Sequence, residues 1–337
     1  MLMRLSTILD PFLLALAATV ALAAVLPAHG AAAEAASIAA KSAIALLFFL
    51  YGARLSPQQA WHGVRQWRLH LLVLATTFVL FPLLGLAARA LVPAVLTNDL
   101  YRGVLFLCLV PSTVQSSIAF TSIARGHVSA AIVSASLSNI LGIVLTPLLV
   151  VLLMDTSGAI RVDGSSIRDI VVQLLLPFGA GQLARPWIAG LITRYAALLK
   201  VVDRGSILLV VYTAFSMGVV QGIWGSVDVW RLILVSLVAA VLLVVVLAVT
   251  TVLGRVARLD RGDAIVLLFC GSKKSLASGL PMALVFFPAA TVGLTMLPLM
   301  IFHQIQLVVC AVIASRLARE ADETSSQSAT AEVGEET

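Results

Sequence analysis

The sequence predicts an all-α polytopic membrane protein with ten transmembrane helices. Hydrophobic residues make up 61% of the 337 residues, charged residues make up 11%, and the mean hydropathy is +1.07. A soluble domain of average composition carries about 25% charged residues. The apolar runs are long enough, at about 20 residues, to cross a bilayer as helices, and they lack the alternation of an outer-membrane barrel. Backbone polar groups that face lipid must then be satisfied within helices.

Ten apolar segments account for nearly the whole chain and leave no room for a soluble domain. The expected spans are residues 9–27, 37–55, 71–92, 103–124, 127–153, 169–191, 205–223, 231–253, 264–286 and 290–315. They predict one transporter domain at 1–318. The segment 319–337 is acidic, rich in Ser and Thr and free of aromatic residues, so it predicts a disordered cytoplasmic tail.

Basic residues divide unequally between the two predicted sides of the membrane. One side receives fourteen: Arg4, Arg54, Arg65, Arg68, Arg125, Arg185, Arg194, Lys200, Arg204, Arg255, Arg258, Arg261, Arg316 and Arg319. The other side receives six: Lys41, Arg89, Arg102, Arg161, Arg168 and Arg231. The positive-inside rule therefore places both termini in the cytoplasm of a cell inner or plasma membrane. The net charge of +6 belongs to these loops and to anionic lipid, and it does not indicate nucleic-acid binding.

The N-terminus has a second interpretation. Met1 to Arg4, the apolar run that follows and the small residues of "PAHGAAAEA" near residue 30 resemble a cleavable signal peptide. We favour a retained first span, because cleavage would leave nine spans and would put the termini on opposite sides.

The three cysteines indicate neither a metal site nor a disulfide framework. Cys108, Cys270 and Cys310 lie in apolar runs without paired spacing. We expect small buried hydrophobic side chains at these positions.

Polar residues gather in the fourth predicted span, in the stretch "VPSTVQSS". Pro111 removes a backbone donor and disfavours helix at Val110, so we expect the helix to open there. The polar side chains that follow the opening are Ser112, Thr113, Gln115, Ser116 and Ser117.

A second polar cluster, "CGSKKSLASGLP", lies in the ninth predicted span. Lys273 and Lys274 are the only Lys, Arg, Asp or Glu residues between Ala264 and Ser315. Lys273 lies ten residues from Asp263, which at 1.5 Å per residue is about 15 Å and so the midplane of a roughly 30 Å hydrocarbon layer. A charge there costs about 2.5–3.5 kcal/mol.

The type of residue favours a functional site over a purely structural one. The chain has four lysines and eighteen arginines, and two of the four lysines lie at this spot. Lysine can lose its proton where arginine cannot, and desolvation beside a like charge favours that loss, so proton coupling is one expectation. The alternative is that the lysines pair with polar groups to hold two helices together.

The two clusters occupy equivalent places when the ten spans are split five and five. Five spans are an odd number, so the second copy, at about 165–318, must cross the membrane in the opposite sense to the first, at about 1–155. Interrupted helices at matching positions of an inverted repeat indicate a transporter's midplane site.

Three stretches then carry a family resemblance. They are "PSTVQSSIAFTSIARG" at 111–126, "SASLSNILG" at 134–142 with Leu-Thr-Pro at 145–147, and "GSKKSLASGLPMA" at 271–283. With them the chain resembles the bile acid:sodium symporter superfamily over residues 5–317, and within it the branch related to solute carrier family 10 member 7. The resemblance implies a ten-helix inverted repeat in which broken helices 4 and 9 cross. It also implies a core of helices 3–5 and 8–10 that moves against a panel of helices 1, 2, 6 and 7.

The chain departs from the bile-acid branch where that branch holds two sodium ions. The resemblance aligns Phe269 with a Glu, Lys273 with a Gln, and Ser117-Ile118 with a Ser-Asn pair. On helix 5, Ala131 and Ala135 replace hydroxyl ligands, although Ser134, Ser136, Ser138 and Asn139 are near. A sodium cage needs several hard oxygens, preferably with a carboxylate. We therefore expect a protonated lysine in the electrostatic role of the missing ion, with a residual sodium site near Ser117, Ser134 and Ser272 as the alternative.

The predicted function is secondary active transport of a small organic anion. The expected substrate-binding residues are Ser112, Thr113, Gln115, Ser116, Ser117, Ser138, Asn139, Gly271, Ser272, Lys273, Lys274 and Ser275. We expect Lys273 to serve the substrate or the coupling ion and Lys274 to pair with polar groups of helix 4 or 5. No cofactor is expected, and sodium and a proton both remain candidates for the coupling ion.

Three alternatives have different consequences. A sodium-coupled symporter of a bile-acid-like or sterol-type anion would follow the resemblance most closely. A membrane sensor or regulatory subunit would bind a solute without moving it. An intramembrane enzyme is disfavoured, because no Asp or Glu lies at the predicted midplane to activate a nucleophile. Partners other than solute and lipid are not expected, and a monomer and a homodimer both remain open.

Overall fold

The computed structural model describes residues 11–54, 66–154, 171–220, 222, 228–288 and 291–335, and all regular elements in these ranges are helices. This confirms an all-α chain. The positions of Arg4, Arg65, Arg161 and Arg168 in the predicted loops lie outside the described residues. The first residues of the alternative signal peptide also lie outside the described residues.

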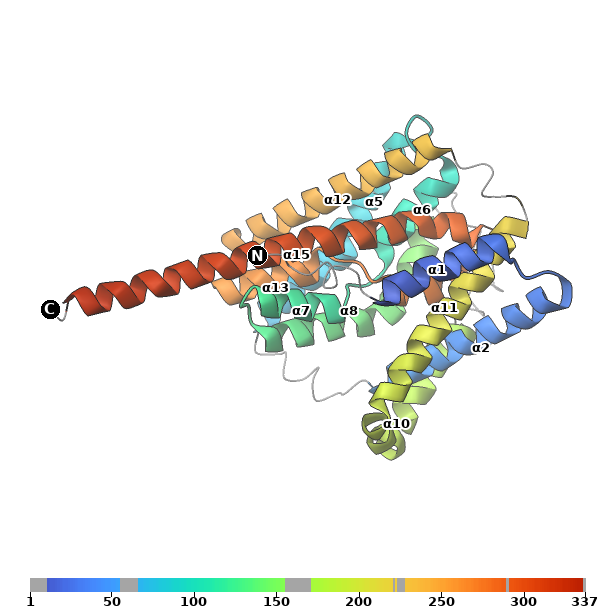
Figure 1. The fold of residues 1–337 in the computed structure, drawn as a ribbon, viewed down its shortest axis with the longest axis horizontal. Helices are drawn as coiled ribbons and strands as arrows, with labels where there is room; N and C mark the ends of the chain where they lie inside the picture. The colour runs from blue at the N-terminus through green and yellow to red at the C-terminus, as the bar shows by residue number, and fades with distance from the viewer. Residues whose placement is uncertain are drawn as a thin grey trace.

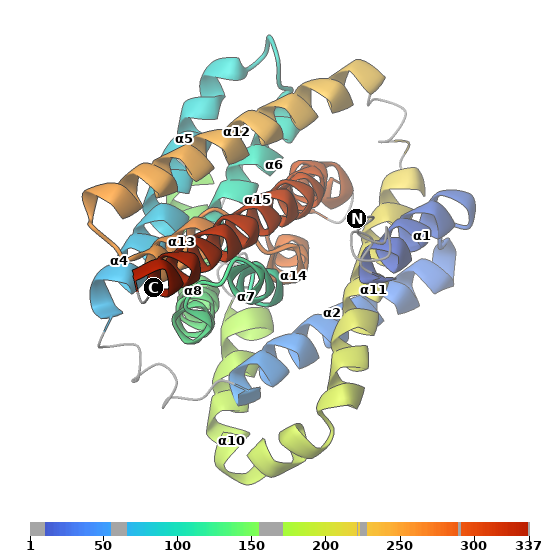
Figure 2. The same ribbon diagram turned by 60° about the vertical axis from the view of Figure 1, so that its left-hand side comes forward.

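One group of helices forms one side of the molecule in Figures 1 and 2 and packs against the rest through α11. We call it the α2 group. It comprises α1 (Pro11–Val25), α2 (Gly30–Arg54), η6 (Val171–Leu175), α10 (Leu176–Arg194) and α11 (Ala196–Val220). Within it α2 packs against α10 and α11, and α1 packs against α11.

The remaining helices form a second body, which we call the broken-helix group. It comprises α4 (Trp67–Ala75), η3 (Thr76–Leu80), α5 (Phe81–Ala87), η4 (Ala88–Leu91), α6 (Asn98–Leu109), α7 (Gln115–Ile123), α8 (Val128–Leu149), η5 (Val150–Met154), α12 (Val229–Val256), α13 (Arg261–Gly271), α14 (Leu276–Phe286) and α15 (Val292–Glu335). In both views α15 runs along its middle, beside α12 and α13 (Figures 1 and 2). Helix α15 runs on to Glu335. The expectation of a disordered cytoplasmic tail at 319–337 stays a prediction.

Five of the described helices are long and apolar enough to cross a membrane. These are Gly30–Arg54, Trp67–Leu91, Val128–Met154, Val229–Val256 and Val292–Ala321. Their surfaces carry exposed Leu, Val and Trp side chains, for example Trp67 and Val244. Such a surface is stable in lipid and unfavourable in water, which agrees with an integral membrane protein.

The fourth and ninth apolar segments are each interrupted near their middle. Residues 110–114 separate α6 from α7, and residues 272–275 separate α13 from α14. Val110 has an extended backbone (φ −73°, ψ 156°), as expected for a residue that precedes proline. Ser275 starts α14 as its N-cap, with a side chain that accepts a hydrogen bond from the Ser278 N–H. Both interruptions therefore have local causes in the sequence.

Glycines allow α2 and α10 to touch through their backbones. A Cβ on Gly52 would lie 2.1 Å from the Phe178 carbonyl oxygen, and one on Gly181 would lie 2.0 Å from the Phe49 carbonyl oxygen. Only glycine fits at such distances, and small residues promote close helix packing in membranes. Within the α2 group, α2 and α10 are therefore in direct backbone contact.

Candidate functional site

The two interrupted helices meet and are hydrogen-bonded to each other through their main chains. The Ser275 N–H donates to the Pro111 carbonyl at 2.9 Å. At this crossing α6 and α13 end while α7 and α14 begin. Carbonyl groups at helix C-termini carry partial negative charge and amide groups at helix N-termini carry partial positive charge. The crossing thus brings together helix ends of both signs, whose backbone groups need partners from outside their own helices.

Serines of the first interruption satisfy the backbone of the second. The Ser112 hydroxyl donates to the Cys270 carbonyl at 2.5 Å, and the Ser117 hydroxyl donates to the Phe269 carbonyl at 3.1 Å. Both serines are fully buried. A buried carbonyl without a partner costs about 1–3 kcal/mol, so these bonds stabilise the end of α13.

Helix α8 supports the first interruption from the other side. The Ser112 N–H donates to the Ser138 hydroxyl at 3.1 Å, and the Asn139 amide donates to the Ser112 carbonyl at 2.8 Å. Asn139 also accepts a hydrogen bond from the Ser278 hydroxyl at 2.8 Å, which links α8 to α14. Ser138 and Asn139 therefore lie at the crossing, as predicted.

Lys274 is buried with its ammonium group against three backbone carbonyls. Its Nζ donates to the carbonyls of Thr77, Cys108 and Val110 at 2.9, 2.9 and 2.7 Å, and it lies 4.2 Å from the centre of the Phe81 ring. The three carbonyls account for all three ammonium donors. We expected Lys274 to pair with helix 4 or 5; helix 4 supplies two carbonyls, and Thr77 of η3 supplies the third.

Lys273 is equally buried but sits in a different environment. Its Nζ donates to the Ser116 hydroxyl at 3.3 Å and lies 4.3 Å from the centre of the Phe120 ring. The Phe269 ring is 5.7 Å away on α13. Aromatic faces attract a cation, so both rings stabilise the ammonium group. Neither lysine has exposed surface.

The last helix supports the lysine segment from behind. The side chain of Gln306 on α15 accepts a hydrogen bond from the Lys274 N–H and donates one to the Lys274 carbonyl, both at 2.8 Å. It also contacts His303 Nδ1 at 2.8 Å. Ser272 turns back and donates to the Leu268 carbonyl of its own helix. A Cβ on Gly271 would lie 2.6 Å from the Thr76 hydroxyl oxygen, so this position requires glycine.

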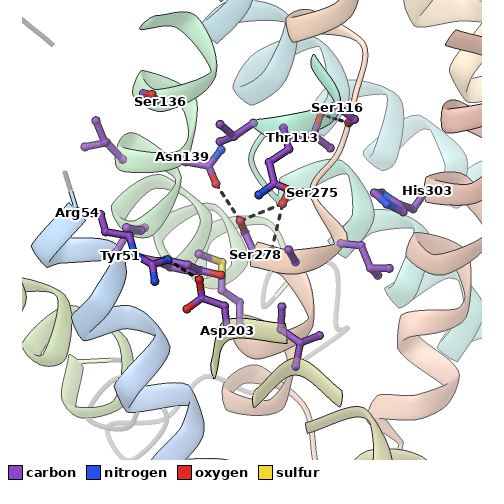
Figure 3. Close-up of a pocket in the computed structure, with 18 of the residues that line it drawn as sticks. Tyr51, Arg54, Thr113, Ser116, Ser136, Asn139, Asp203, Ser275, Ser278 and His303 are labelled. Atoms are coloured by element: carbon purple, nitrogen blue, oxygen red, sulfur yellow. Dashed lines mark hydrogen bonds and ion pairs between the residues drawn. The ribbon is translucent and has the colours of Figure 1, made fainter. Parts of the chain in front are cut away.

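A cavity of about 670 Å³ lies between the crossing and the α2 group (Figure 3). Its polar wall on the broken-helix side includes predicted site residues: Thr113, Gln115, Ser116, Asn139 and Ser275. Ser136, Ser278 and His303 line it as well. The other predicted site residues do not line it: Ser112, Ser117, Ser138, Gly271, Ser272, Lys273 and Lys274. They form a buried layer behind the wall, and Lys273 reaches the wall through Ser116.

The opposite wall of the cavity carries charged residues that the sequence did not predict as site residues. Arg54 of α2 and Asp203 of α11 form an ion pair there, beside Tyr51 (Figure 3). Arg204 also lines the cavity. A sequence signal exists, because Phe48, Tyr51 and Arg54 recur every three residues and so share one helix face. The sequence analysis used Arg54 only to count basic residues on each side of the membrane, so it did not consider Arg54 as a site residue.

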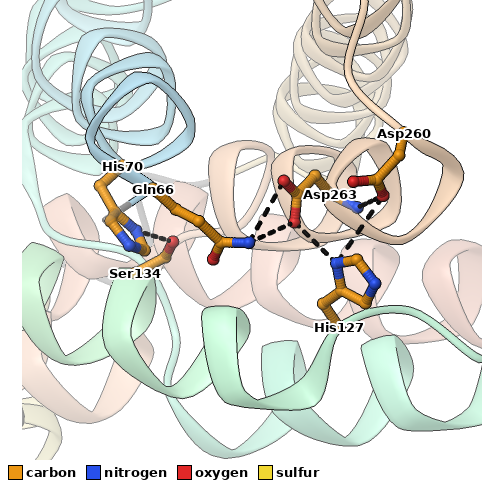
Figure 4. Close-up of polar contacts among 6 residues, drawn as sticks. All are labelled: Gln66, His70, His127, Ser134, Asp260 and Asp263. Atoms are coloured by element: carbon orange, nitrogen blue, oxygen red, sulfur yellow. Dashed lines mark hydrogen bonds and ion pairs between the residues drawn. The ribbon is translucent and has the colours of Figure 1, made fainter. Parts of the chain in front are cut away.

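A separate polar cluster joins α13 to the start of α8 (Figure 4). His127 Nδ1 lies 2.9 Å from Asp263 Oδ1 and 3.7 Å from Asp260 Oδ1, and the Gln66 amide donates to Asp263 at 3.3 Å. The hydrogen bond to Asp263 raises the pKa of His127, which lies just before the apolar helix Val128–Met154. One His and two carboxylates within 4.8 Å of one another could ligate a cation, but the cluster is largely exposed and its groups already pair with one another.

The comparisons with known proteins agree with this architecture. Residues 10–319 match the SBF-like CPA transporter family. The chain belongs to this family.

Bacterial relatives cover nearly the full chain. The chain is 52% identical to "Uncharacterized protein PA2026" of Pseudomonas aeruginosa, over 93% of this chain and 94% of that protein. It is 48% identical to "Putative symporter YfeH" of Escherichia coli K12, over 96% of this chain and 98% of that protein. A more distant relative is "Sodium/bile acid cotransporter 7" of Rattus norvegicus, at 26% identity over 80% of each chain.

The hydroxyl groups suggested for a residual sodium site in this SBF-like transporter already have protein partners. Ser134 contacts His70 Nδ1 at 2.7 Å (Figure 4), Ser117 donates to the Phe269 carbonyl, and Ser272 donates to the Leu268 carbonyl. Neutral hydroxyl oxygens can still coordinate a cation, so these bonds do not test the site. A residual sodium site there stays a prediction.

Proposed function

We propose that this SBF-like transporter is a secondary active carrier that moves a small organic anion by alternating access. The observation that carries the proposal is the position of the cavity. It lies between the crossing of the broken helices and the α2 group, and residues of both bodies line it. Its volume is in the range of about 300–1,000 Å³ that suits small-molecule sites. Movement of one body against the other would open the cavity to either side.

The broken helices support the inverted-repeat part of the proposal. The α6–α7 and α13–α14 segments are the fourth apolar segment of each half, and they cross where their backbones are hydrogen-bonded. In transporters built from inverted repeats, such helices hold solute and coupling ion near the midplane. The proposed orientation in the cell inner membrane keeps both termini in the cytoplasm.

Lys274 would replace a bound cation at this crossing. Three carbonyl oxygens at 2.7–2.9 Å surround its ammonium group, as they would surround a metal ion. Lys273 would act on the solute or coupling ion through Ser116, its hydrogen-bond partner in the cavity wall. We infer that the carrier needs no sodium ion at the position that Lys274 fills.

A second candidate function is a sodium-coupled symporter of a bile-acid-like anion. The name of the rat relative supports it, at 26% identity. The two candidates differ in their response to sodium, which is measurable on the same protein.

Transport is tested in proteoliposomes with benzoate, naphthalene-2-sulfonate and estrone sulfate as radiolabelled probes. We expect accumulation of a probe against its gradient when a proton or sodium gradient is imposed. A sensor or regulatory subunit would bind a probe without accumulating it, and that result would contradict the proposal.

Lys273→Ala should abolish this accumulation, because the variant loses the ammonium group behind Ser116. The control is Lys41→Ala, which removes an exposed lysine of α2 and should leave uptake unchanged. Gel filtration in detergent establishes that both variants are folded. Normal uptake by a folded Lys273→Ala protein would show that Lys273 has no role in transport.

A further inference from the structure

The cavity wall formed by α2 and α11 contains an ion pair with an incomplete hydrogen-bond network. Arg54 Nη1 donates to Asp203 Oδ2, and the side chains of Arg54 and Asp203 keep 30% and 17% of their surface exposed. The second carboxylate oxygen, Asp203 Oδ1, is buried and has no hydrogen-bond partner among the described residues. Figure 3 shows the pair beside Tyr51 at the cavity.

Of the cationic groups near the cavity, the arginines are the ones that a solute can touch. Arg54 and Arg204 line the cavity, whereas Lys273 and Lys274 have no exposed surface. All three donors of Lys274 are used by backbone carbonyls. An anion in the cavity therefore meets a guanidinium group before it meets an ammonium group.

The chemistry of a guanidinium group suits this task. Arg has five N–H donors in a planar fork, and carboxylate, sulfonate and sulfate oxygens fit that fork. Among the described residues, the Arg54 side chain makes one hydrogen bond, from Nη1 to Asp203, so the fork has donors for further acceptors. The anion and Asp203 would compete for the same positive charge.

We infer that Arg54 binds the anionic group of the solute and that Asp203 holds this position in the solute-free carrier. The inference rests on the proposed function and deepens it. Apolar side chains such as Phe48, Phe178 and Ile207 also line the cavity, and they would contact the apolar part of the solute. The displaced Asp203 carboxylate remains beside Tyr51 and Arg204, with His303 of α15 on the opposite wall.

The test measures probe binding through the thermal unfolding midpoint of the purified protein in detergent. The probes are benzoate, naphthalene-2-sulfonate and estrone sulfate. Asp203→Asn removes the competing charge, so we expect about two- to fivefold tighter binding, which is the range for a partly exposed ion pair. Arg54→Gln should weaken binding at least about tenfold.

A double variant separates binding from folding. Arg54→Gln with Asp203→Asn replaces the ion pair with two neutral polar groups, so it should keep the contact between α2 and α11 but not bind the anion. The matched control is Asp99→Asn, which removes one partner of the Arg102–Asp99 ion pair outside the cavity and should leave affinity unchanged.

Each outcome bears on a different claim. A wild-type protein that no probe stabilises contradicts the proposed function. If a probe stabilises the wild type and the double variant equally, transport remains supported and the role of Arg54 is overturned. If Asp203→Asn fails to tighten binding while Arg54→Gln weakens it, Asp203 is not a competitor.

Discussion

Two adjacent lysines solve the problem of a buried charge in different ways. Lys274 satisfies all its donors with carbonyls of η3 and of the α6 end. Lys273 has one hydroxyl partner and two aromatic faces. Adjacent residues of a regular helix point about 100° apart, so the unwound backbone at 272–275 is what allows both groups to be placed inside the protein.

The residue types at the crossing were predictable, but their partners were not. In a sequence of this hydropathy, Pro111 predicts a break in the helix, and the lysine pair predicts a buried charge. The carbonyl partners of Lys274 could not be predicted, because backbone carbonyls have no residue signature. The sequence also did not indicate that Lys273 lies behind the cavity wall, with Ser116 between its ammonium group and the cavity.

His127 provides a pH-dependent prediction at the scale of one residue. Its pKa is raised in the folded protein by the hydrogen bond to Asp263, so the protonated form is favoured in the folded state. The stability it contributes is present below the unfolded pKa of about 6.5 and is lost as the pH rises through the folded value.

Thermal unfolding between pH 5.5 and 9, roughly one unit below the unfolded pKa to well above it, measures this contribution. The wild type should be more stable than His127→Gln at the low end, and the difference should shrink as the pH rises. The control is His29→Gln, which removes an exposed histidine before α2 that is not part of the Asp263 cluster. A difference that grows with pH would contradict the assignment.

At the scale of elements, backbone contact holds α2 and α10 together. Gly52 faces the Phe178 carbonyl and Gly181 faces the Phe49 carbonyl, so neither helix can shift without losing this fit. The sequence predicted both helices but not their contact, because glycines in apolar helices are too common to identify a partner. The close approach emerges only from the packed structure.

Gly181→Ala should lower the free energy of unfolding by about 1–3 kcal/mol, the usual effect of overpacking. Gly190→Ala lies on the same helix with nothing within 4 Å of the added Cβ, so it should be neutral or slightly stabilising. Thermal unfolding of both variants in detergent makes the comparison. Equal stability of the two would contradict the packing of α2 on α10.

At the scale of the molecule, the division into two bodies is what makes a carrier mechanism physically reasonable. Buried apolar side chains such as Phe48, Val210, Phe106 and Phe302 belong to one continuous cluster that joins the bodies. The cavity interrupts this contact beside the crossing. Hydropathy predicted the apolar segments, and Pro111 and the polar clusters predicted the breaks, while the grouping of the helices came only with the family resemblance.

The predicted membrane orientation is testable by cysteine labelling. Glu34→Cys and Ala94→Cys should react with an impermeant maleimide added outside the cell, and Ala257→Cys should react only after permeabilisation. Background should be low, since Cys108, Cys270 and Cys310 are all buried. Labelling of position 34 or 94 only from the cytoplasm would reverse the topology.

The role of Lys274 as a built-in cation is tested most directly by the sodium dependence of stability. A bound ion at concentration c stabilises the folded state by RT ln(1 + c/Kd), which keeps rising with the logarithm of the ion concentration after the site is nearly full. Thermal unfolding of the wild type should therefore give the same midpoint in sodium chloride and in choline chloride at equal ionic strength. A midpoint that keeps rising with the logarithm of the sodium concentration, but not with that of choline, would show that the folded protein binds sodium and would contradict the role of Lys274 as the built-in cation.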